Sequence, residues 1–104
     1  METAVKKYVK FPLGKTVSTA GVNARIASDV EFSVFVYQSL RRHAKGDWGD
    51  LEGEDKEMNE IGLIKGKEGR LLSRYNFQSD RGLDIYIITE WDRSSTCILF
   101  PREY

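Results

Sequence analysis

The sequence has little cysteine, no long apolar run and no surplus of basic residues, and each shortage removes a class of protein. Its one cysteine, Cys97, has no partner for an internal disulfide, which indicates a reducing compartment, and we interpret it as a small core residue. No apolar segment approaches the roughly 18 residues that span a bilayer, and the start of the chain has no apolar stretch of signal-peptide length. We therefore expect an intracellular protein that does not contact a membrane.

Catalytic and cofactor-binding motifs are scarce as well. The chain has one histidine, no cluster of Cys and His at metal-ligand spacing, no G-x-S-x-G turn and no glycine-rich phosphate loop. The sequence therefore predicts no catalytic residue, no metal site and no cofactor.

Charge is balanced overall but unevenly distributed. The 16 basic and 16 acidic residues cancel, and a nucleic-acid-binding protein would usually show a basic excess, so we expect no direct nucleic-acid contact. Residues 47–60 contain seven acidic residues and one lysine, a balance of −6. Such a segment fits either a basic partner or a solvated helix face.

The composition suits one domain spanning residues 1–104, with 40% hydrophobic and 31% charged residues. Residues 7–22 are β-prone but interrupted by Pro12 and Gly14, which favours an edge strand. Residues 69–78 alternate in polarity, and residues 83–90 and 96–101 are rich in β-branched and aromatic residues. Turn signals separate the three segments, as in a β-meander.

Two helices are expected between these strands. The first follows a capping box at Ser28–Glu31 and ends at Gly46. The second runs from about residue 51 to 65, with an apolar stripe of Met58, Ile61 and Ile64 expected to pack inward. The predicted fold is α+β: an antiparallel sheet of three or four strands, made of the C-terminal meander and an N-terminal edge strand, with two helices on one face.

The segment "HAKGDWGD", residues 43–50, admits two interpretations. As a catalytic site, His43 would act as a base beside an aspartate. As a structural joint, a glycine ends the first helix, an aspartate caps the second, an indole wedges the two together and Gly49 lets the backbone pass close beside that ring. We favour the joint, which consists of His43, Gly46, Asp47, Trp48, Gly49 and Asp50.

A second polar segment, "TEWDRSST" at residues 89–96, forms the turn between the last two strands. Trp91 in this turn either packs back on the sheet or contacts a partner. The second interpretation follows because Trp and Arg dominate binding hot spots. With the acidic segment, the predicted partner-binding residues are Glu52, Glu54, Glu57, Glu60, Tyr86, Trp91 and Arg93.

The strings GDWG and ITE-x-DRS together resemble a family of small proteins carried by bacteriophages, plasmids and other mobile elements, and the resemblance covers roughly residues 15–104. Trp91 and Cys97 depart from the family's usual small or β-branched residues. The matching residues are His43, Gly46, Asp47, Trp48, Gly49, Asp55, Asn59, Arg70, Ser73, Tyr75, Ile88, Thr89, Glu90, Asp92, Arg93, Ser94, Thr96, Pro101, Glu103 and Tyr104.

This resemblance implies a mobile-element accessory protein in the cytoplasm of a bacterial host. The leading hypothesis is a non-enzymatic, anti-CRISPR-like inhibitor that binds a defence nuclease, most plausibly a CRISPR effector, through an acidic face that mimics nucleic acid. One alternative is a small hydrolase or metal-dependent enzyme that uses His43 with Asp47, Glu90 and Asp92. Another is a structural or regulatory homodimer that pairs through an edge strand, so either a monomer or a homodimer is expected.

Overall fold

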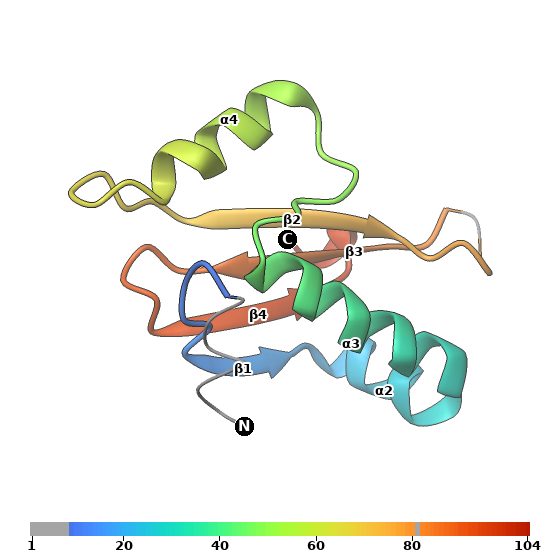
Figure 1. The fold of residues 1–104 in the computed structure, drawn as a ribbon. Helices are drawn as coiled ribbons and strands as arrows, with labels where there is room; N and C mark the ends of the chain where they lie inside the picture. Colours follow the sequence, from blue (N-terminus) through green and yellow to red (C-terminus); the bar gives the residue numbers. More distant parts are fainter. Residues whose placement is uncertain (1–8, 81) are drawn as a thin grey trace.

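The structure, a computed structural model, describes residues 9–80 and 82–104 (Figure 1). The prediction of an α+β fold with a C-terminal β-meander is confirmed. In the described residues the elements, in chain order, are β1 (Lys15–Ser18), α2 (Ala20–Ser28), α3 (Val30–Ala44), α4 (Gly53–Gly62), β2 (Leu71–Asn76), β3 (Asp84–Thr89), β4 (Ser95–Leu99) and the 3₁₀ helix η1 (Pro101–Glu103). None of the described helices is both long and apolar enough to cross a bilayer.

The sheet has the order β1-β4-β3-β2 and is mixed, so the prediction of an antiparallel sheet was wrong for one strand. β2, β3 and β4 pair antiparallel through short connections. β1 lies at the expected edge but runs parallel to β4. The helices α2, α3 and α4 and two strands separate β1 from β4 along the chain, so no hairpin forces the two strands to be antiparallel. The part of the β-prone segment that precedes Val9 lies outside the described residues.

The structure has one more α-helix than predicted. α2 begins at Thr19, whose hydroxyl accepts from the amide of Val22, and only Val22 in this helix is buried. Its weak apolar pattern explains why the sequence did not reveal it. The predicted capping box is also wrong, because Ser28 is the last residue of α2 and the carboxylate of Asp29 accepts from the amide of Phe32 to begin α3.

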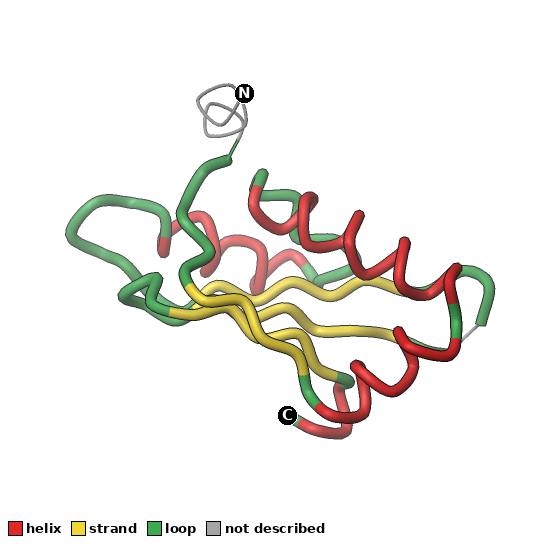
Figure 2. The backbone as a smooth tube through the Cα atoms, turned by 90° about the horizontal axis from the view of Figure 1, so that it is seen from below, coloured by secondary structure: helices red, strands yellow, loops and turns green. Residues whose placement is uncertain are grey.

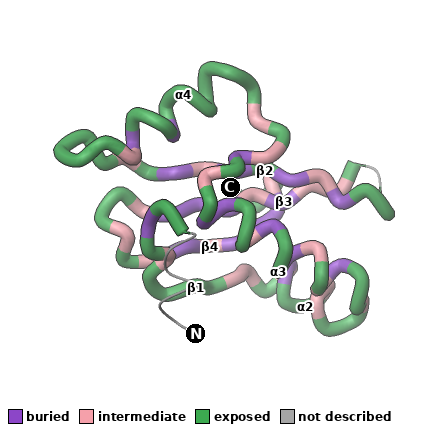
Figure 3. Tube along the Cα trace, in the orientation of Figure 1, coloured by how far each residue is buried: buried purple, intermediate pink, exposed green. Residues whose placement is uncertain are grey.

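The main core lies between the sheet and the helices α2 and α3. Figure 2 shows α3 and α4 on the same side of the sheet, and Figure 3 shows buried residues along the strands and the inner side of α3. β2 contributes alternate residues to this side, since Leu71, Ser73 and Tyr75 are buried while their neighbours are not. The core residues are Val22, Phe32, Val36, Tyr75, Phe77, Ile85, Ile87, Ile98 and Phe100.

α4 packs against the outer edge of β2 with the side of the helix next to the predicted one. Asn59 and Gly62 are the buried residues of this helix. A Cβ on Gly62 would lie 3.1 Å from the side chain of Leu71, so the glycine permits the close approach. Met58 and Ile61 are 63% and 45% exposed, and Ile64 beyond the helix is 49% exposed, so the predicted inward stripe faces solvent.

Candidate functional site

The segment 43–50 ends α3 as predicted. Gly46 has a left-handed φ of +79° just after the C-cap residue Lys45. Its amide donates to the carbonyl of His43, and the amide of Asp47 donates to the carbonyl of Arg42. These two bonds satisfy carbonyls that the end of the helix would otherwise leave free, in the Schellman arrangement.

The aspartates of this segment do not cap the next helix, which corrects the prediction. α4 begins after Glu52, which makes no side-chain capping bond. Asp47 instead accepts two hydrogen bonds from the guanidinium of Arg42, at 2.7 and 3.1 Å, and one from the amide of Gly49. The bond from Arg42 is the largest cause of the lowered pKa of Asp47. The side chain therefore fixes its own loop.

The loop after the joint runs along the free edge of β2. The amide of Arg74 donates to the carbonyl of Trp48, and the amide of Asp50 donates to the carbonyl of Arg74. The carboxylate of Asp50 accepts from the amide of Asn76, at 3.0 Å. Residues 48–50 thus occupy the hydrogen-bonding positions that a further strand would use.

Gly49 is required at this edge for steric reasons. Its φ is +73°, and an added Cβ would lie 2.0 Å from the carbonyl oxygen of Arg74 and 2.7 Å from the ring of Tyr75. The prediction that Gly49 allows a close approach is confirmed, but the ring it passes is that of Tyr75 and not that of Trp48.

His43 is fully buried and lies within a chain of hydroxyl groups. Its Nδ1 is 2.5 Å from the hydroxyl of Ser73, and its Nε2 is 2.9 Å from the hydroxyl of Thr89. The hydroxyls of Thr89 and Thr96 are 2.7 Å apart, and Thr96 donates to the carbonyl of Leu13. Burial, with a smaller contribution from the charge of Arg93, lowers the pKa of His43 to about 3.

This chain has one consistent direction. Thr96 has a single proton and uses it on a carbonyl, so it must accept from Thr89. Thr89 then accepts from Nε2–H of His43, and the neutral ring accepts at Nδ1 from the hydroxyl of Ser73. Every group is satisfied, so the imidazole links β2 to β3 and the hydroxyl chain extends the link to β4 and to the loop at Leu13. The sequence placed His43 in a joint between helices and did not predict this network.

Trp48 is buried in a small cluster with Phe11 and Leu71, and it packs edge-on against the His43 ring at 5.7 Å. Its indole N–H donates to the carboxylate of Glu60 at 2.6 Å. The wedge predicted between the helices is therefore present, and Glu60, predicted to bind a partner, anchors α4 to it.

The four residues of the hydrolase alternative do not converge. The imidazole of His43 bonds hydroxyl groups, as described above. Each carboxylate is bonded elsewhere: Asp47 to Arg42, Glu90 to Arg70, and Asp92 to the amide of Ser94. In residues 9–80 and 82–104, no group of three or more His, Cys, Asp or Glu side chains could hold a metal ion.

The predicted partner-binding residues have different environments. Glu52, Glu54 and Glu57 are exposed at the start and on the outer side of α4, and Trp91 is 63% exposed at the β3–β4 turn. Tyr86 is half-buried on the sheet face away from α3, with its ring 5.8 Å from that of Tyr104.

Arg93 is a scaffold residue. It has a φ of +60°, and its guanidinium donates to the carbonyl of Gly62 at the end of α4, to that of Gly69 and to those of Glu90 and Trp91 in its own turn. The side chain thus fastens the β3–β4 turn to the C-terminal end of α4.

Two features were missed at the sequence level. Asn59 binds the edge of β2 through both atoms of its amide, which no local pattern indicates. The exposed apolar residues of α4 were read as a core stripe, although the acidic residues at the same helical spacing were a signal that this side faces water.

Comparisons of the chain with protein-family models, with curated protein sequences and with solved structures give no match.

Proposed function

We propose that this protein is a non-enzymatic inhibitor that binds a bacterial defence nuclease, most plausibly a CRISPR effector, and competes with nucleic acid for it. The resemblance to mobile-element proteins supports the choice of target. The surface that supports binding is the outer stripe of α4, which we define as Glu54, Glu57, Met58 and Ile61, together with Trp91.

The observation that carries the proposal is the composition of this stripe. The four residues lie at positions i, i+3, i+4 and i+7, which places them on one side of the helix. All four are exposed, whereas Asn59 and Gly62 on the neighbouring side of the helix are buried. Two carboxylates therefore flank two large apolar side chains, Met58 and Ile61, that are 63% and 45% exposed.

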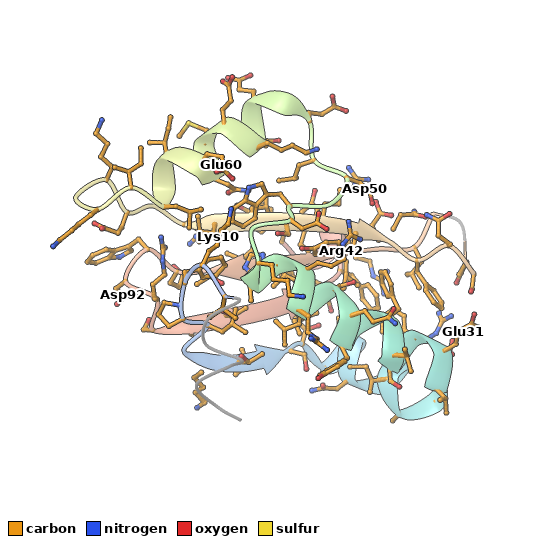
Figure 4. All side chains as sticks on the ribbon, in the orientation of Figure 1. Lys10, Glu31, Arg42, Asp50, Glu60 and Asp92 are labelled. Carbon is orange, nitrogen blue, oxygen red and sulfur yellow. The ribbon has the colours of Figure 1, made fainter. Side chains whose placement is uncertain are left out.

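Trp91 belongs to the same end of the molecule. Because Arg93 bonds both the last residue of α4 and the carbonyl of Trp91, the turn that carries the indole is held beside the helix. Figure 4 labels Asp92 beside this end and Glu31 at the opposite end of the molecule. One partner could therefore contact the outer stripe and Trp91 together.

The chemistry of this surface fits a cationic groove with an apolar floor. The exposed carboxylates of Glu52, Glu54 and Glu57 would be attracted to a nuclease channel that binds phosphates. Charge alone would give an easily screened complex. The apolar side chains Met58, Ile61 and Trp91 supply short-range contacts that phosphates lack.

The experiment begins with a pull-down from a bacterial host that expresses its defence systems, followed by inhibition assays with the captured nuclease. We expect Trp91→Ala and the double variant Glu54→Gln/Glu57→Gln each to weaken inhibition about 10-fold or more, the effect of losing a hot-spot residue or two steering charges. Glu60 is left intact because it anchors Trp48.

A matched control variant removes two negative charges at a site far from the outer stripe. Glu31→Gln/Asp80→Asn lowers the negative charge by two at the other end of the fold, on exposed residues, and should leave inhibition unchanged. If the two double variants weaken inhibition equally, net charge and not the outer stripe is responsible, and the proposal is wrong. Full inhibition by a folded Trp91→Ala/Met58→Ala variant would also refute it.

A further inference from the structure

α3 and the C-terminal end of β2 enclose a cleft of about 510 Å³, which we call the α3–β2 cleft. This volume lies within the range of about 300–1,000 Å³ that is typical of ligand sites. One wall is the side of α3 from Glu31 to Arg42, and the other is residues 76–79. Figure 4 labels Glu31 near the start of α3, with Arg42 and Asp50 near the other end of the cleft.

The floor of the α3–β2 cleft is aromatic. The rings of Phe35 and Phe77 both line it, and their centroids lie 5.0 Å apart. Phe77 is buried and Phe35 is half-buried, so the core ends at this point and its last ring is open to the cleft. Val34, which also lines the cleft, is 48% exposed. An apolar side chain of a ligand would therefore find apolar contacts here.

The edge of β2 that borders the cleft ends in a free carbonyl. Residues 48–50 cover this edge along Arg74, and their last bond joins the carboxylate of Asp50 to the amide of Asn76. The amide and carbonyl of one strand residue point to the same side, so the carbonyl of Asn76 faces outward too. No described residue donates to it. The side chain of Asn76 is bonded to Asp84, which leaves its backbone to line the cleft.

The opposite wall has a buried hydroxyl without a partner. Ser39 is 2% exposed and lines the cleft. Its hydroxyl makes no hydrogen bond to a described residue, whereas the hydroxyl of Ser33 on the same helix donates to the carbonyl of Val30. Among the described residues no fully buried polar side-chain atom lacks a partner, so the Ser39 hydroxyl is open to the cleft. Such a group orients a ligand in a mainly apolar site.

The charges around the cleft make it acidic. Glu31 and Asp50 line it, and neither belongs to an ion pair with a described residue. Arg42 also lines the cleft, but its guanidinium is held by two bonds to Asp47, at 2.7 and 3.1 Å. The cleft therefore attracts a cationic ligand and repels an anionic one.

We propose that the α3–β2 cleft binds an extended peptide segment of a partner protein in which apolar and basic residues alternate. The segment adds to the edge of β2 beyond residues 48–50, donates a main-chain N–H to the carbonyl of Asn76 and faces the hydroxyl of Ser39. Strand addition takes its affinity from main-chain hydrogen bonds and its specificity from pockets for alternate side chains. The stretch from Glu31 to Arg42 measures roughly 16 Å at about 1.5 Å per residue, which matches about five extended residues.

The alternation follows from the geometry of a strand. Successive side chains point to opposite sides, so every second one faces the floor at Phe35 and Phe77, where apolar residues are favoured. The side chains between them remain in solvent, where lysine or arginine is attracted to the carboxylates of Glu31 and Asp50. The cleft shares no residue with the outer stripe of α4, so the inference does not depend on the proposed function.

The probe for this site is a hexapeptide of alternating lysine and valine, blocked at both ends and titrated into the ¹⁵N-labelled full chain. We expect saturable shifts in the amide signals of residues 31–42 and 76–79, with a Kd of about 1 mM or tighter. One control peptide has glutamate in place of lysine, and another is methylated at every backbone nitrogen. Each should bind at least about 10-fold more weakly, because the first is repelled and the second has no main-chain donor.

Two matched pairs of variants on α3 locate the site. Val34→Arg fills the cleft and adds a like charge, whereas Val30→Arg adds the same charge outside it, at exposures of 48% and 80%. Val34→Arg should weaken peptide binding at least about 10-fold, and Val30→Arg should bind as the wild type does. Ser39→Ala should weaken binding about 3- to 10-fold, the effect of one hydrogen bond, and Ser33→Ala should not. Circular dichroism checks that all four variants are folded.

Four results would overturn the proposal. The first is an absence of shifts up to about 5 mM peptide. The second is equal binding of either control peptide. The third is a set of shifts confined to the acidic side of α4 at Glu54 and Glu57, which would mean attraction by charge alone. The fourth is a shift of the cleft signals with protein concentration and no peptide, because a second copy of the chain then occupies the cleft. None of these results bears on nuclease inhibition through α4, so the two proposals fail separately.

Discussion

The side-chain amide of Asn59 and the backbone of Leu72 form a two-bond pair. The Asn59 Nδ2 donates to the carbonyl of Leu72 at 2.6 Å, and its Oδ1 accepts from the Leu72 amide at 3.0 Å. One side chain of α4 thus makes the same two bonds that a neighbouring strand would make. With residues 48–50 further along, it closes the edge of β2.

Loss of this amide should strongly destabilise the protein. Asn59 is 3% exposed, so Asn59→Ala leaves the amide and the carbonyl of Leu72 buried without hydrogen-bond partners. We expect the unfolding free energy to fall by about 2–4 kcal/mol. Gln38→Ala, which shortens an exposed amide on α3, should change stability by less than about 0.5 kcal/mol. Urea unfolding of both variants measures the difference, and similar values would contradict the pairing.

Two glycines with similar backbone angles should respond differently to alanine. Gly49 and Gly66 have φ of +73° and +88°, but a Cβ on Gly49 would collide with backbone 2.0 Å away, whereas no atom lies within 4 Å of one on Gly66. We expect Gly66→Ala to cost about 1 kcal/mol, the conformational term. Gly49→Ala should cost about 3 kcal/mol or more, because the β2 edge must move. Equal melting temperatures for the two variants would show that the loop is not pressed against β2.

The buried imidazole predicts a specific dependence of stability on pH. His43 is neutral in the fold because its pKa is lowered to about 3, whereas in the unfolded chain it binds a proton below about 6.5. The unfolded state therefore binds more protons between these values, so stability is complete above pH 6.5 and falls as the pH decreases. From pH 7 to pH 5 the loss should be about 2 kcal/mol.

The chain has one histidine, and ordinary carboxylates titrate below this window, so the measurement isolates His43. Denaturant unfolding at pH 7, 6 and 5 should give the slope for the wild type, and His43→Gln should lose it while being less stable throughout. A flat profile in the wild type would mean that the imidazole reaches solvent.

Substitution of two acidic residues of α4 should have different effects on stability, because one is a structural contact and the other is exposed. Glu60 accepts from the indole of Trp48, so Glu60→Ala should lower stability by about 1 kcal/mol and shift the tryptophan fluorescence. Glu57 is exposed on the outer stripe, and Glu57→Ala should leave stability within about 0.5 kcal/mol while weakening nuclease binding. The interpretation of Glu60 fails if both variants unfold at the same denaturant concentration.

The sequence predicted the elements with strong periodicity and missed those defined by distant contacts. The meander and α3 follow from alternation and from a helical apolar stripe, and Gly46 ends α3 as its position indicates. α2 buries a single residue, Val22, so it has almost no local signal. The parallel pairing of β1 depends on where the helices lead the chain, which no local pattern records.

The candidate site was predicted only where local sequence determines it, and was missed where distant contacts do. The joint of residues 43–50 is architectural, as its glycines and indole suggested. Hydrophobic periodicity alone predicted the wrong orientation for Met58 and Ile61, because the inward positions are held by an amide and a glycine, which it does not count. The acidic residues on the same side of the helix were the one local signal for the outward orientation. Arg93 was read as a contact residue, since a turn sequence does not show that its side chain reaches the end of another helix.

The buried hydroxyl chain has a consequence for folding. A two-residue slip between β2, β3 and β4 would keep every apolar side chain on its own face, so hydrophobic patterning alone tolerates that error. The slip would however replace Thr89 by Ile87 beside the imidazole and leave Nε2–H without an acceptor. The buried hydrogen bonds of His43 therefore select one strand register among several that apolar packing alone would allow.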